Sequence, residues 1–540
     1  MNLHSPLLLS NGNIRTLEDK FPFAHTLLIS GGRIRAVGGD EIRKTAPSHT
    51  KIIDLEGRTV LPGMTDPHFH FYEWAMLRRN LSLSAAVSLD DLLFRVRNAT
   101  HEKTKGDWII GQGWNEADWP VRQMPGRKDL DQAAPDHPLI LWRCDLHLAA
   151  VNSPALKKAG IQKNTADPPE GKIGRDASGE PDGILKESAI NLIRNVIPSP
   201  SDRDIIRAMQ EGIPALHGLG LTGIHDVRIM NDQKSAAAFR AWTRIRENGE
   251  LRLRCHVTLS GDYLEDALAL GLRSGFGDEY LRIGHVKFFA DGGMGARTAW
   301  MTAAYADAAY GMPLISMKKL EKMIRTADAK GLAVMVHAIG DRANREVIGI
   351  FERLVSAPRP HSPCGPSVPH RMEHLQMIRP EDVKRLSRLN VVACMQPHNM
   401  ILDMNMVDEC IGSEAVYVYA FKNILNAGIP LMFGSDAPVC DPSPFVNIHA
   451  AVTRQRKDGS PEGGWYPEQR ISVDAALKAY TSVPAQVHGL ADISGTIRPG
   501  KQADLIVTDR DIYTVDPMEI ADTKVEMCIF DGEIVRDCRQ

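Results

Sequence analysis

The 540-residue sequence lacks most features that mark secreted, membrane-bound or nucleic-acid-binding proteins. Its eight cysteines form no CxxC pair and no short-range cluster, so we expect buried or free thiols in a reducing compartment rather than a disulfide framework. The formal net charge of -3 favours neither nucleic acid nor an anionic membrane surface as a partner. No electrostatic partner is therefore implied.

Long hydrophobic runs are also absent. The N-terminal stretch MNLHSPLLLSNGNIRTLEDKF has no basic segment and too short an apolar run, which argues against a signal peptide and a membrane span. We therefore expect a cytoplasmic protein that starts with a strand and a turn. Because 540 residues exceed what one hydrophobic core usually holds, at least two structural units are expected.

Short apolar runs separated by turn signals occupy both ends of the chain. The N-terminal runs are PLLLSNGNIRTL, TLLISGGRIRAVGG and KIIDLEGRTVLPG, and the C-terminal runs are GTIRPGKQADLIVTD and VEMCIFDGEIVRD. Neither end alone supplies enough strands to close a core, and the termini of a domain often lie close together. We predict one composite β-sandwich from residues 1–62 and 485–540, with two separate β-appendages as the alternative.

Between the ends, strand-like runs alternate with helical patterns, which is typical of βα units around a parallel sheet. Eight such units close into an α/β fold of the (β/α)8 TIM-barrel type, here over residues 63–484, with its sites at the C-terminal ends of the strands. A gap too long for one helix and loop follows the first run, so we predict an inserted lobe at about 85–205. The eight runs lie at residues 59–70, 220–226, 251–260, 281–292, 332–341, 369–376, 391–398 and 429–438.

Polar residues suited to metal binding stand at the ends of these predicted strands. His68 and His70 end the first strand and, as residues i and i+2, project to the same side. An isolated HxH pair is more often a packed or surface feature than a metal site. Further candidates at the ends of other strands favour a metal centre: Lys287, His337, His374 and Asp436.

Together these segments resemble the amidohydrolase superfamily, in the branch that includes N-substituted formamide deformylase. The resemblance covers nearly the whole chain and is carried by ISGGRIRAVG, LPGMTDPHFH, GLTGIHD, VKFFADGGMGARTA, VHAIGDRA, MEHLQ, GSDAP and GTIRPGKQADLIV. It implies a barrel with a split β-sandwich and a site for one or two divalent metal ions, usually Zn²⁺. An even-numbered assembly such as a homodimer is in keeping with this superfamily.

The resemblance implies a metal ligand set of His68, His70, Lys287, His337, His374 and Asp436. Neutral imidazoles and carboxylates suit Zn²⁺, which lowers the pKa of a bound water from about 15.7 to near 7. Asp436 is expected to contact the metal, take the proton of the attacking water and pass it to the leaving nitrogen. For its GSDAP segment, a plain turn after a strand is the alternative.

Lys287 is expected to act as a carboxylated lysine. Beside a metal its amine loses the proton readily and can react with CO₂ to form a carbamate that bridges two ions. His68 and His70 would then hold one ion, and His337 and His374 the other. In the alternative, Lys287 pairs with Asp291 and one ion is bound.

The expected activity is that of a metal-dependent amidohydrolase, which cleaves a non-peptide, amide-like C–N bond of a small molecule by attack of metal-bound hydroxide. An N-substituted formamide is the substrate that the branch suggests. Related deaminases carry a glutamate three residues after the fifth-strand histidine, where this chain has Gly340. A deaminase or cyclic-amide hydrolase is one alternative; a catalytically silent metal-containing binding scaffold is another, against which Asp436 argues.

Substrate contacts are expected from the insertion and from a glycine-rich loop. Trp114, Glu116 and His147 resemble branch motifs and are predicted to reach over the barrel mouth, although core packing of Trp114 and Trp119 fits equally well. The loop GGMGARTAW is predicted to be a mobile lid or to stabilise an oxyanion through its backbone N–H groups and Arg297. A plain flexible loop is the alternative.

Three further positions bear on the predicted metal site and on the choice of substrate. His225 matches a branch motif but receives no ligand role, and His285 is predicted to pack lower in the barrel, two residues before Lys287. Relatives often carry an arginine where this chain has Ala415, which weakens the transfer of any relative's substrate.

Overall fold

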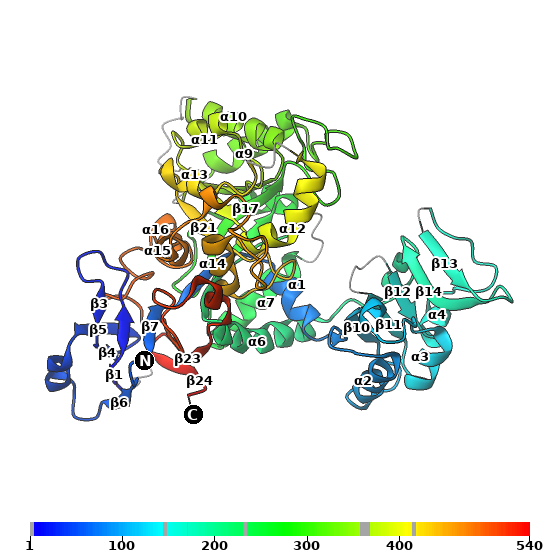
Figure 1. Ribbon diagram of the computed structural model, residues 1–540, viewed down its shortest axis with the longest axis horizontal. Helices are drawn as coiled ribbons and strands as arrows, with labels where there is room; N and C mark the ends of the chain where they lie inside the picture. Colours follow the sequence, from blue (N-terminus) through cyan, green and yellow to red (C-terminus); the bar gives the residue numbers. More distant parts are fainter. Residues whose placement is uncertain are drawn as a thin grey trace. The chain divides into compact units, whose positions relative to one another are not determined.

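The computed structural model describes residues 5–143, 148–169, 171–229, 235–356, 368–412 and 417–539 (Figure 1). The chain divides into two compact units. The larger unit consists of Met1–Glu73 and Met209–Gln540, and the smaller of Trp74–Ala208. Among the described helices, none is both long and apolar enough to cross a membrane.

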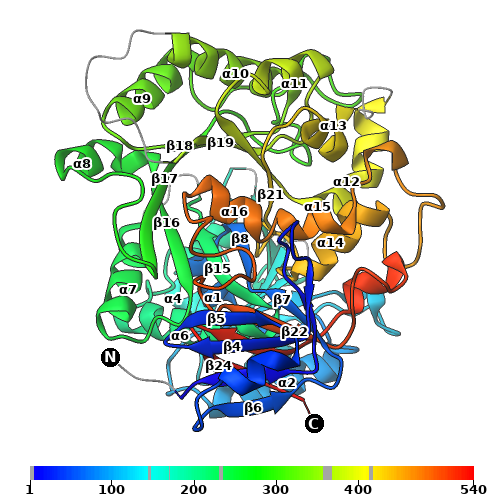
Figure 2. The same cartoon turned by 90° about the vertical axis from the view of Figure 1, so that its left-hand side faces the viewer.

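Eight parallel strands form the central sheet of the larger unit (Figure 2). They pair in chain order from the first to the eighth, as expected for βα units, and each lies within one of the eight predicted runs. The fold class predicted from the sequence is thus confirmed. The strands are β8 (Met64–Phe69), β15 (Leu221–Asp226), β16 (Arg254–Ser260), β17 (Leu281–Phe289), β18 (Val334–Ala338), β19 (His370–His374), β20 (Val391–Met395) and β21 (Leu431–Phe433).

Helices between these strands lie outside the sheet (Figure 2). In α10 (Asp341–Ser356), the apolar residues Val347, Phe351 and Leu354 recur at helical spacing and are buried, which is the pattern of a helix with one face on a core. The other helices of this unit are α7 (Ser235–Glu247), α8 (Leu264–Ala269), α9 (Met317–Ala329), α11 (Pro380–Leu386), α12 (Pro397–Cys410), α13 (Phe421–Asn426), α14 (Pro444–Thr453), α15 (Val473–Lys478) and α16 (Ser482–Val487).

Hydrogen bonds beyond the strand ends connect the eighth strand to the first. The N–H of Asp436 donates to the carbonyl of His68 at 2.8 Å, and the N–H of His70 donates to the carbonyl of Ala437 at 2.9 Å. The buried carboxylate of Asp66 accepts from the N–H groups of His68 at 2.9 Å and Ser435 at 3.0 Å. This seam holds the HxH segment and Asp436 side by side.

Both ends of the chain build a β-sandwich. One sheet has the strand order β5-β4-β1-β6, and the other, β24-β23-β22-β7-β2-β3, joins N-terminal and C-terminal strands. Its strands β7 and β22 pair antiparallel, with Leu61 opposite Ile506. The strands are β1 (Leu7–Ser10), β2 (Asn13–Arg15), β3 (Phe23–Ala24), β4 (Thr26–Ser30), β5 (Arg33–Gly38), β6 (Lys51–Asp54), β7 (Thr59–Pro62), β22 (Leu505–Thr508), β23 (Val525–Phe530) and β24 (Glu533–Asp537).

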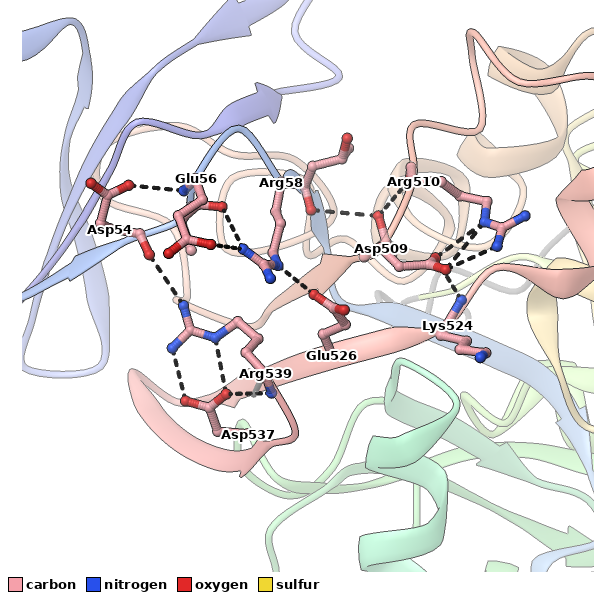
Figure 3. Close-up of polar contacts among 12 residues, drawn as sticks. Asp54, Glu56, Arg58, Asp509, Arg510, Lys524, Glu526, Asp537 and Arg539 are labelled. Carbon is pink, nitrogen blue, oxygen red and sulfur yellow. Dashed lines mark hydrogen bonds and ion pairs between the residues drawn. The ribbon is translucent and has the colours of Figure 1, made fainter.

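Polar contacts also cross between the two ends of the chain (Figure 3). Arg58 forms an ion pair with Glu526, and Arg539 donates to the main-chain carbonyl of Asp54 at 3.4 Å. These contacts are partly exposed, so each adds little, on the order of 1 kcal/mol or less. The shared apolar core, with Leu9, Ile29 and Val507 among its buried residues, contributes more to holding the ends together.

The smaller unit has its own six-stranded sheet and contains the predicted insertion. The sheet order is β13-β14-β12-β11-β10-β9, and two clusters of buried apolar residues pack around it. Its strands are β9 (Leu81–Ser82), β10 (Ile109–Trp114), β11 (Leu139–Arg143), β12 (Leu148–Val151), β13 (Gly171–Arg175) and β14 (Pro181–Glu187). Its helices are α2 (Leu89–His101), α3 (Arg127–Ala133), α4 (Ser153–Lys158) and α5 (Ile190–Arg194), while α1 (Phe71–Leu77) and α6 (Asp202–Gly218) span its boundaries in the sequence.

The six cysteines in the described part of the chain are free thiols, as expected from their spacing. They are Cys255, Cys394, Cys410, Cys440, Cys528 and Cys538.

Candidate metal centre

Four histidine rings and one carboxylate meet at the C-terminal ends of the barrel strands. Ring centroids lie 5.5 Å apart for His68 and His70, 4.9 Å for His68 and His374, and 4.4 Å for His337 and His374. Oδ1 of Asp436 lies 2.9 Å from Nε2 of His70 and 3.4 Å from Nε2 of His68. The structure therefore brings these five predicted residues together from distant parts of the sequence.

Each of these histidines has one ring nitrogen fixed by a hydrogen-bond acceptor. An acceptor requires an N–H on the nitrogen that faces it, so the opposite nitrogen keeps its lone pair. The second ring nitrogen, the one that can offer a lone pair, is therefore Nε2 in His68, His70 and His374 and Nδ1 in His337; in His70 this nitrogen contacts Asp436. The four acceptors are the Glu373 carboxylate for His68, the Val227 carbonyl for His70 at 2.9 Å, the Gly292 carbonyl for His337 at 3.3 Å, and Oε1 of Gln396 for His374 at 2.9 Å.

The contact between His70 and Asp436 points to a cation. The lone pair on Nε2 of His70 faces a carboxylate oxygen across 2.9 Å, an arrangement that needs a proton or a metal ion between the two atoms. Burial opposes the charged imidazole, yet the hydrogen bond to Asp436 raises the pKa of His70. Burial likewise favours a neutral carboxyl, and the hydrogen bond from His70 outweighs it, so the pKa of Asp436 is lowered. The carboxylate is therefore an anion available to a metal.

The remaining imidazoles are neutral. Burial lowers the pKa of His68 to about 4 and that of His374 to about 3, and it holds the pKa of His337 well below its usual value. Nε2 of His68 is buried and finds no hydrogen-bond partner among the described residues. Neutral imidazoles with free lone pairs beside a carboxylate are the donor set that Zn²⁺ takes in proteins, so the residues present fit a metal ion.

Lys287 on β17 is part of the same buried group. Its side chain is 3% exposed, and its Nζ makes no hydrogen bond within the described part of the chain. Burial lowers the pKa of the Lys287 amine to about 8. The alternative partner, Asp291, is engaged elsewhere, because its carboxylate accepts the main-chain N–H groups of Trp300 at 2.8 Å, Ile339 at 3.0 Å and Gly340 at 2.9 Å. The structure thus does not form the Lys287–Asp291 pair.

Backbone strain occurs at two of the candidate ligands. Asp436 has φ +60° and His374 has φ +73°, in the left-handed region that side-chain-bearing residues seldom adopt. Gly434, two residues before Asp436, is required sterically, since a Cβ there would lie 2.6 Å from Cβ of His68. The GSDAP segment is therefore both a tight turn and the support of the Asp436 carboxylate.

The glycine-rich loop after β17 packs against the end of β18. A Cβ on Gly340 would lie 2.1 Å from the carbonyl oxygen of Trp300, so the loop backbone occupies the space of a side chain at position 340. A glutamate at this position, as in the related deaminases, would collide with that backbone. Arg297 in the same loop donates to Asp307 at 2.9 Å and to the carbonyl of Met294 at 3.1 Å, so its charge is already paired.

The predicted substrate contacts from the insertion are placed as follows. Trp114 is fully buried in an apolar cluster of the smaller unit, with the ring centroid of Trp119 at 6.3 Å, which favours the packing alternative. Glu116 is 8% exposed and binds Arg143 at 3.0 Å. His147 and Ala415 lie outside the described residues. The substrate roles of Glu116, His147 and Arg297 stay predictions.

A second histidine cluster, formed by His225, His256, His285 and His488, does not have the geometry of a metal site. The rings of His225 and His256 stack at 4.7 Å with an interplanar angle of 5°, so their in-plane lone pairs cannot converge on one ion. Nδ1 of His225 also accepts from the Arg371 guanidinium at 2.8 Å, which puts the proton of His225 on Nε2. His285 contacts the Pro369 carbonyl at 3.0 Å, in line with its predicted packing role.

Sequence reasoning missed the groups that form hydrogen bonds to the candidate ligands. Glu373 directly precedes a predicted ligand in MEHLQ, and this acidic neighbour is the one signal that could have pointed to it. Gln396 is not next to a predicted ligand in the sequence, so no comparable signal points to it. The carbonyls of Val227 and Gly292 leave no signal in a sequence, because every residue has a carbonyl group.

Comparisons with known proteins show which family and which structures this chain resembles. A family model described as "Amidohydrolase family" matches residues 51–536. The chain is 28% identical over 553 residues to N-substituted formamide deformylase of Arthrobacter pascens, covering 97% of each chain. It is 31% identical over 512 residues to the protein LONG AFTER FAR-RED 3 of Arabidopsis thaliana, covering 93% of this chain and 86% of that one. An uncharacterized metal-dependent hydrolase from Pyrococcus horikoshii has a similar structure, with a TM-score of 0.75 and 28% identity over 95% of this chain and 99% of that chain.

Proposed function

This chain belongs to the amidohydrolase family, and on that premise we propose that it is a zinc-dependent hydrolase of an amide-like C–N bond in a small molecule. The observation that carries the proposal is the set of four histidines, each with one ring nitrogen held by its own acceptor, gathered beside an anionic Asp436. A packed core has no need for such a set.

The ligands of the metal in this proposal are His68, His70, His337, His374 and Asp436, with Lys287 as a sixth. A divalent metal ion bound there supplies a water nucleophile of lowered pKa and an electrophile for the carbonyl oxygen of the substrate. Asp436, next to both His68 and His70, takes the proton that the nucleophile loses and returns it to the leaving nitrogen.

Lys287 is proposed to be carboxylated, which provides two oxygens for a pair of ions. Its burial, the lowered pKa of its amine and its lack of a hydrogen-bond partner in the described part of the chain support this role. A neutral amine is the form that reacts with CO₂, and a buried cation without a counter-charge in hydrogen-bond contact is costly.

An N-substituted formamide is the proposed substrate, on the basis of the relative from Arthrobacter pascens. A deaminase is less well supported, because the Trp300 carbonyl occupies the space that a shuttle glutamate at position 340 would need.

The test combines metal analysis with a substrate screen. Protein expressed with added zinc is expected to retain one or two ions per chain and to release amine from a formamide in a screen that includes N-acyl amines and small lactams. Chelation should abolish turnover, and zinc should restore it. A protein that purifies permanently free of transition metals, or that turns over fully without metal, would contradict the proposal.

A further inference from the structure

A buried carboxylate lies directly behind one of the candidate ligands. Glu373 on β19 is fully buried, and its Oε2 contacts Nδ1 of His68, the nitrogen on the side away from Asp436. The acceptors that face the N–H groups of the other three histidines are neutral carbonyl or amide oxygens. Of the four histidines, His68 is therefore the one whose ring nitrogen on the side away from Asp436 is in hydrogen-bond contact with a carboxylate; the Asp291 carboxylate lies farther from Nε2 of His337, at 3.8 Å.

Arg371, two residues earlier on the same strand, fixes this carboxylate. Its Nε donates to Oε1 of Glu373 at 2.9 Å and its Nη2 to Oε2 at 3.2 Å. The same guanidinium donates to the Pro67 carbonyl at 2.8 Å and to Nδ1 of His225 at 2.8 Å. Arg371 thus ties Glu373 to the strand that carries His68 and leaves the carboxylate little freedom to rotate.

The charge of Glu373 is maintained by its partners. Arg371 places its guanidinium against both oxygens of this buried carboxylate, at 2.9 and 3.2 Å, and this counter-charge offsets the cost of burying the anion. Glu373 itself is an unsuitable ligand, since its oxygens are occupied by Arg371 and His68.

We propose that Glu373 is a positioning residue for the metal: it holds the Nδ1–H of His68 so that Nε2 points at the ion, and it makes that imidazole a stronger ligand than its three counterparts. Arg371 holds Glu373 in turn. A carboxylate behind a ligating histidine fixes the ring and raises its basicity, and loss of such a partner typically weakens metal binding about 10- to 100-fold. This inference rests on the proposed function, because it needs a metal at His68.

The experiment measures zinc affinity by chelator competition in wild type, Glu373→Gln and Glu373→Asp, together with thermal unfolding of each metal-free protein. Glu373→Gln keeps the shape but not the charge, and it is expected to bind zinc about 10- to 100-fold more weakly. Glu373→Asp keeps the charge but is one methylene too short to hold the ring as firmly, so its affinity should lie between the two. A packing role predicts the opposite order, because glutamine has the same shape as glutamate.

The matched control is Asp382→Asn. Asp382 on α11 is a carboxylate with 1% exposure that pairs with Arg385 at 2.7 Å and Arg345 at 3.0 Å, outside the barrel sheet. Its loss should lower the unfolding temperature while zinc affinity stays at the wild-type value.

Zinc affinity of the variants and of the wild type distinguishes failure of the positioning role from failure of the proposed function. Wild-type zinc affinity in Glu373→Gln would overturn the positioning role while leaving the proposed function intact. If Glu373→Gln does not fold, wild-type affinity in the shortened Glu373→Asp would overturn the positioning role instead. Absence of zinc binding in the wild-type protein would overturn the proposed function as well.

Discussion

Single residues of the proposed metal centre are assigned two tasks, holding an ion and moving a proton. Asp436 is assigned both tasks, because it lies within 3.4 Å of two histidine nitrogens. Glu373 is assigned neither task and is proposed to act through its contact with His68. Substitutions at these positions should therefore affect metal content and turnover to different extents.

Asp436→Asn is expected to keep the fold and, at saturating zinc, the metal, because the amide has nearly the shape of the carboxylate. Turnover should fall about 10²- to 10⁴-fold, since the amide cannot accept the proton of the nucleophile. The measurement is kcat together with zinc content per chain. An unchanged rate in a zinc-loaded variant would remove Asp436 from the proton transfer.

Lys287→Ala should lose at least one metal position, because the proposed bridging oxygens of the carbamate are lost with the side chain. Short carboxylic acids such as acetate or propionate should restore part of the activity by filling the space of the carbamate. Elemental analysis and activity with and without the acid are the readouts. Lys501→Ala, which removes another buried lysine at 4% exposure, should change neither the metal content nor the activity. Full metal content in Lys287→Ala would favour a plain ammonium role.

The barrel strands lie where the sequence predicts them, but the hydrophobic pattern does not show the boundary between β7 and β8. The apolar run at 59–70 predicts one strand, but the chain forms β7 in the sandwich and β8 in the barrel, separated at Gly63. A Cβ on Gly63 would lie 2.3 Å from Oγ1 of Thr222, so a close approach to β15, invisible in the local pattern, sets the break. Hydrophobic alternation reports burial but not which sheet buries the strand.

Only part of the candidate site can be predicted from the sequence. Candidate ligands at strand ends can be predicted from the sequence, because the barrel topology brings strand ends together and the family resemblance implies the same residues. The partners of those ligands come from main-chain carbonyls and from side chains one layer deeper, such as Glu373 and Gln396. Their positions depend on strand stagger and on the left-handed φ of His374, which the sequence pattern does not encode.

The packing of the glycine-rich loop against the end of β18 can be tested by a substitution at Gly340. Gly340→Ala places a Cβ 2.1 Å from the Trp300 carbonyl oxygen, so the loop must move. We expect a loss of about 1–3 kcal/mol in unfolding free energy and reduced turnover, because the Asp291 contacts beside His337 are displaced. Denaturant unfolding and kcat check this. Gly295→Ala in the same loop is the control, because a Cβ there meets no described atom within 4 Å. It should change the unfolding free energy and kcat less than Gly340→Ala does.

At the scale of the whole larger unit, buried histidines couple folding to pH. Burial lowers the pKa of His256 to about 3 and holds the pKa values of His225, His285 and His488 well below the ordinary value of 6.5. The guanidinium groups of Arg371 and Arg282 also face this second histidine cluster and oppose its protonation. The folded state therefore binds fewer protons than the unfolded state below pH 6.5.

The sign of the effect follows from linkage. Since the unfolded chain takes up the extra protons, the unfolding free energy of the metal-free protein should fall as pH drops below about 6.5, by up to about 1.4 kcal/mol per pH unit for each such histidine. His488→Gln removes one of these groups and should make the slope shallower by about that amount. His49→Gln, which changes an exposed histidine near the N-terminus, should leave the slope as it is. Denaturant unfolding at pH values above, near and below the ordinary histidine pKa, with chelator present, measures all three proteins, and equal slopes in wild type and His488→Gln would show that the cluster is not protonated on unfolding.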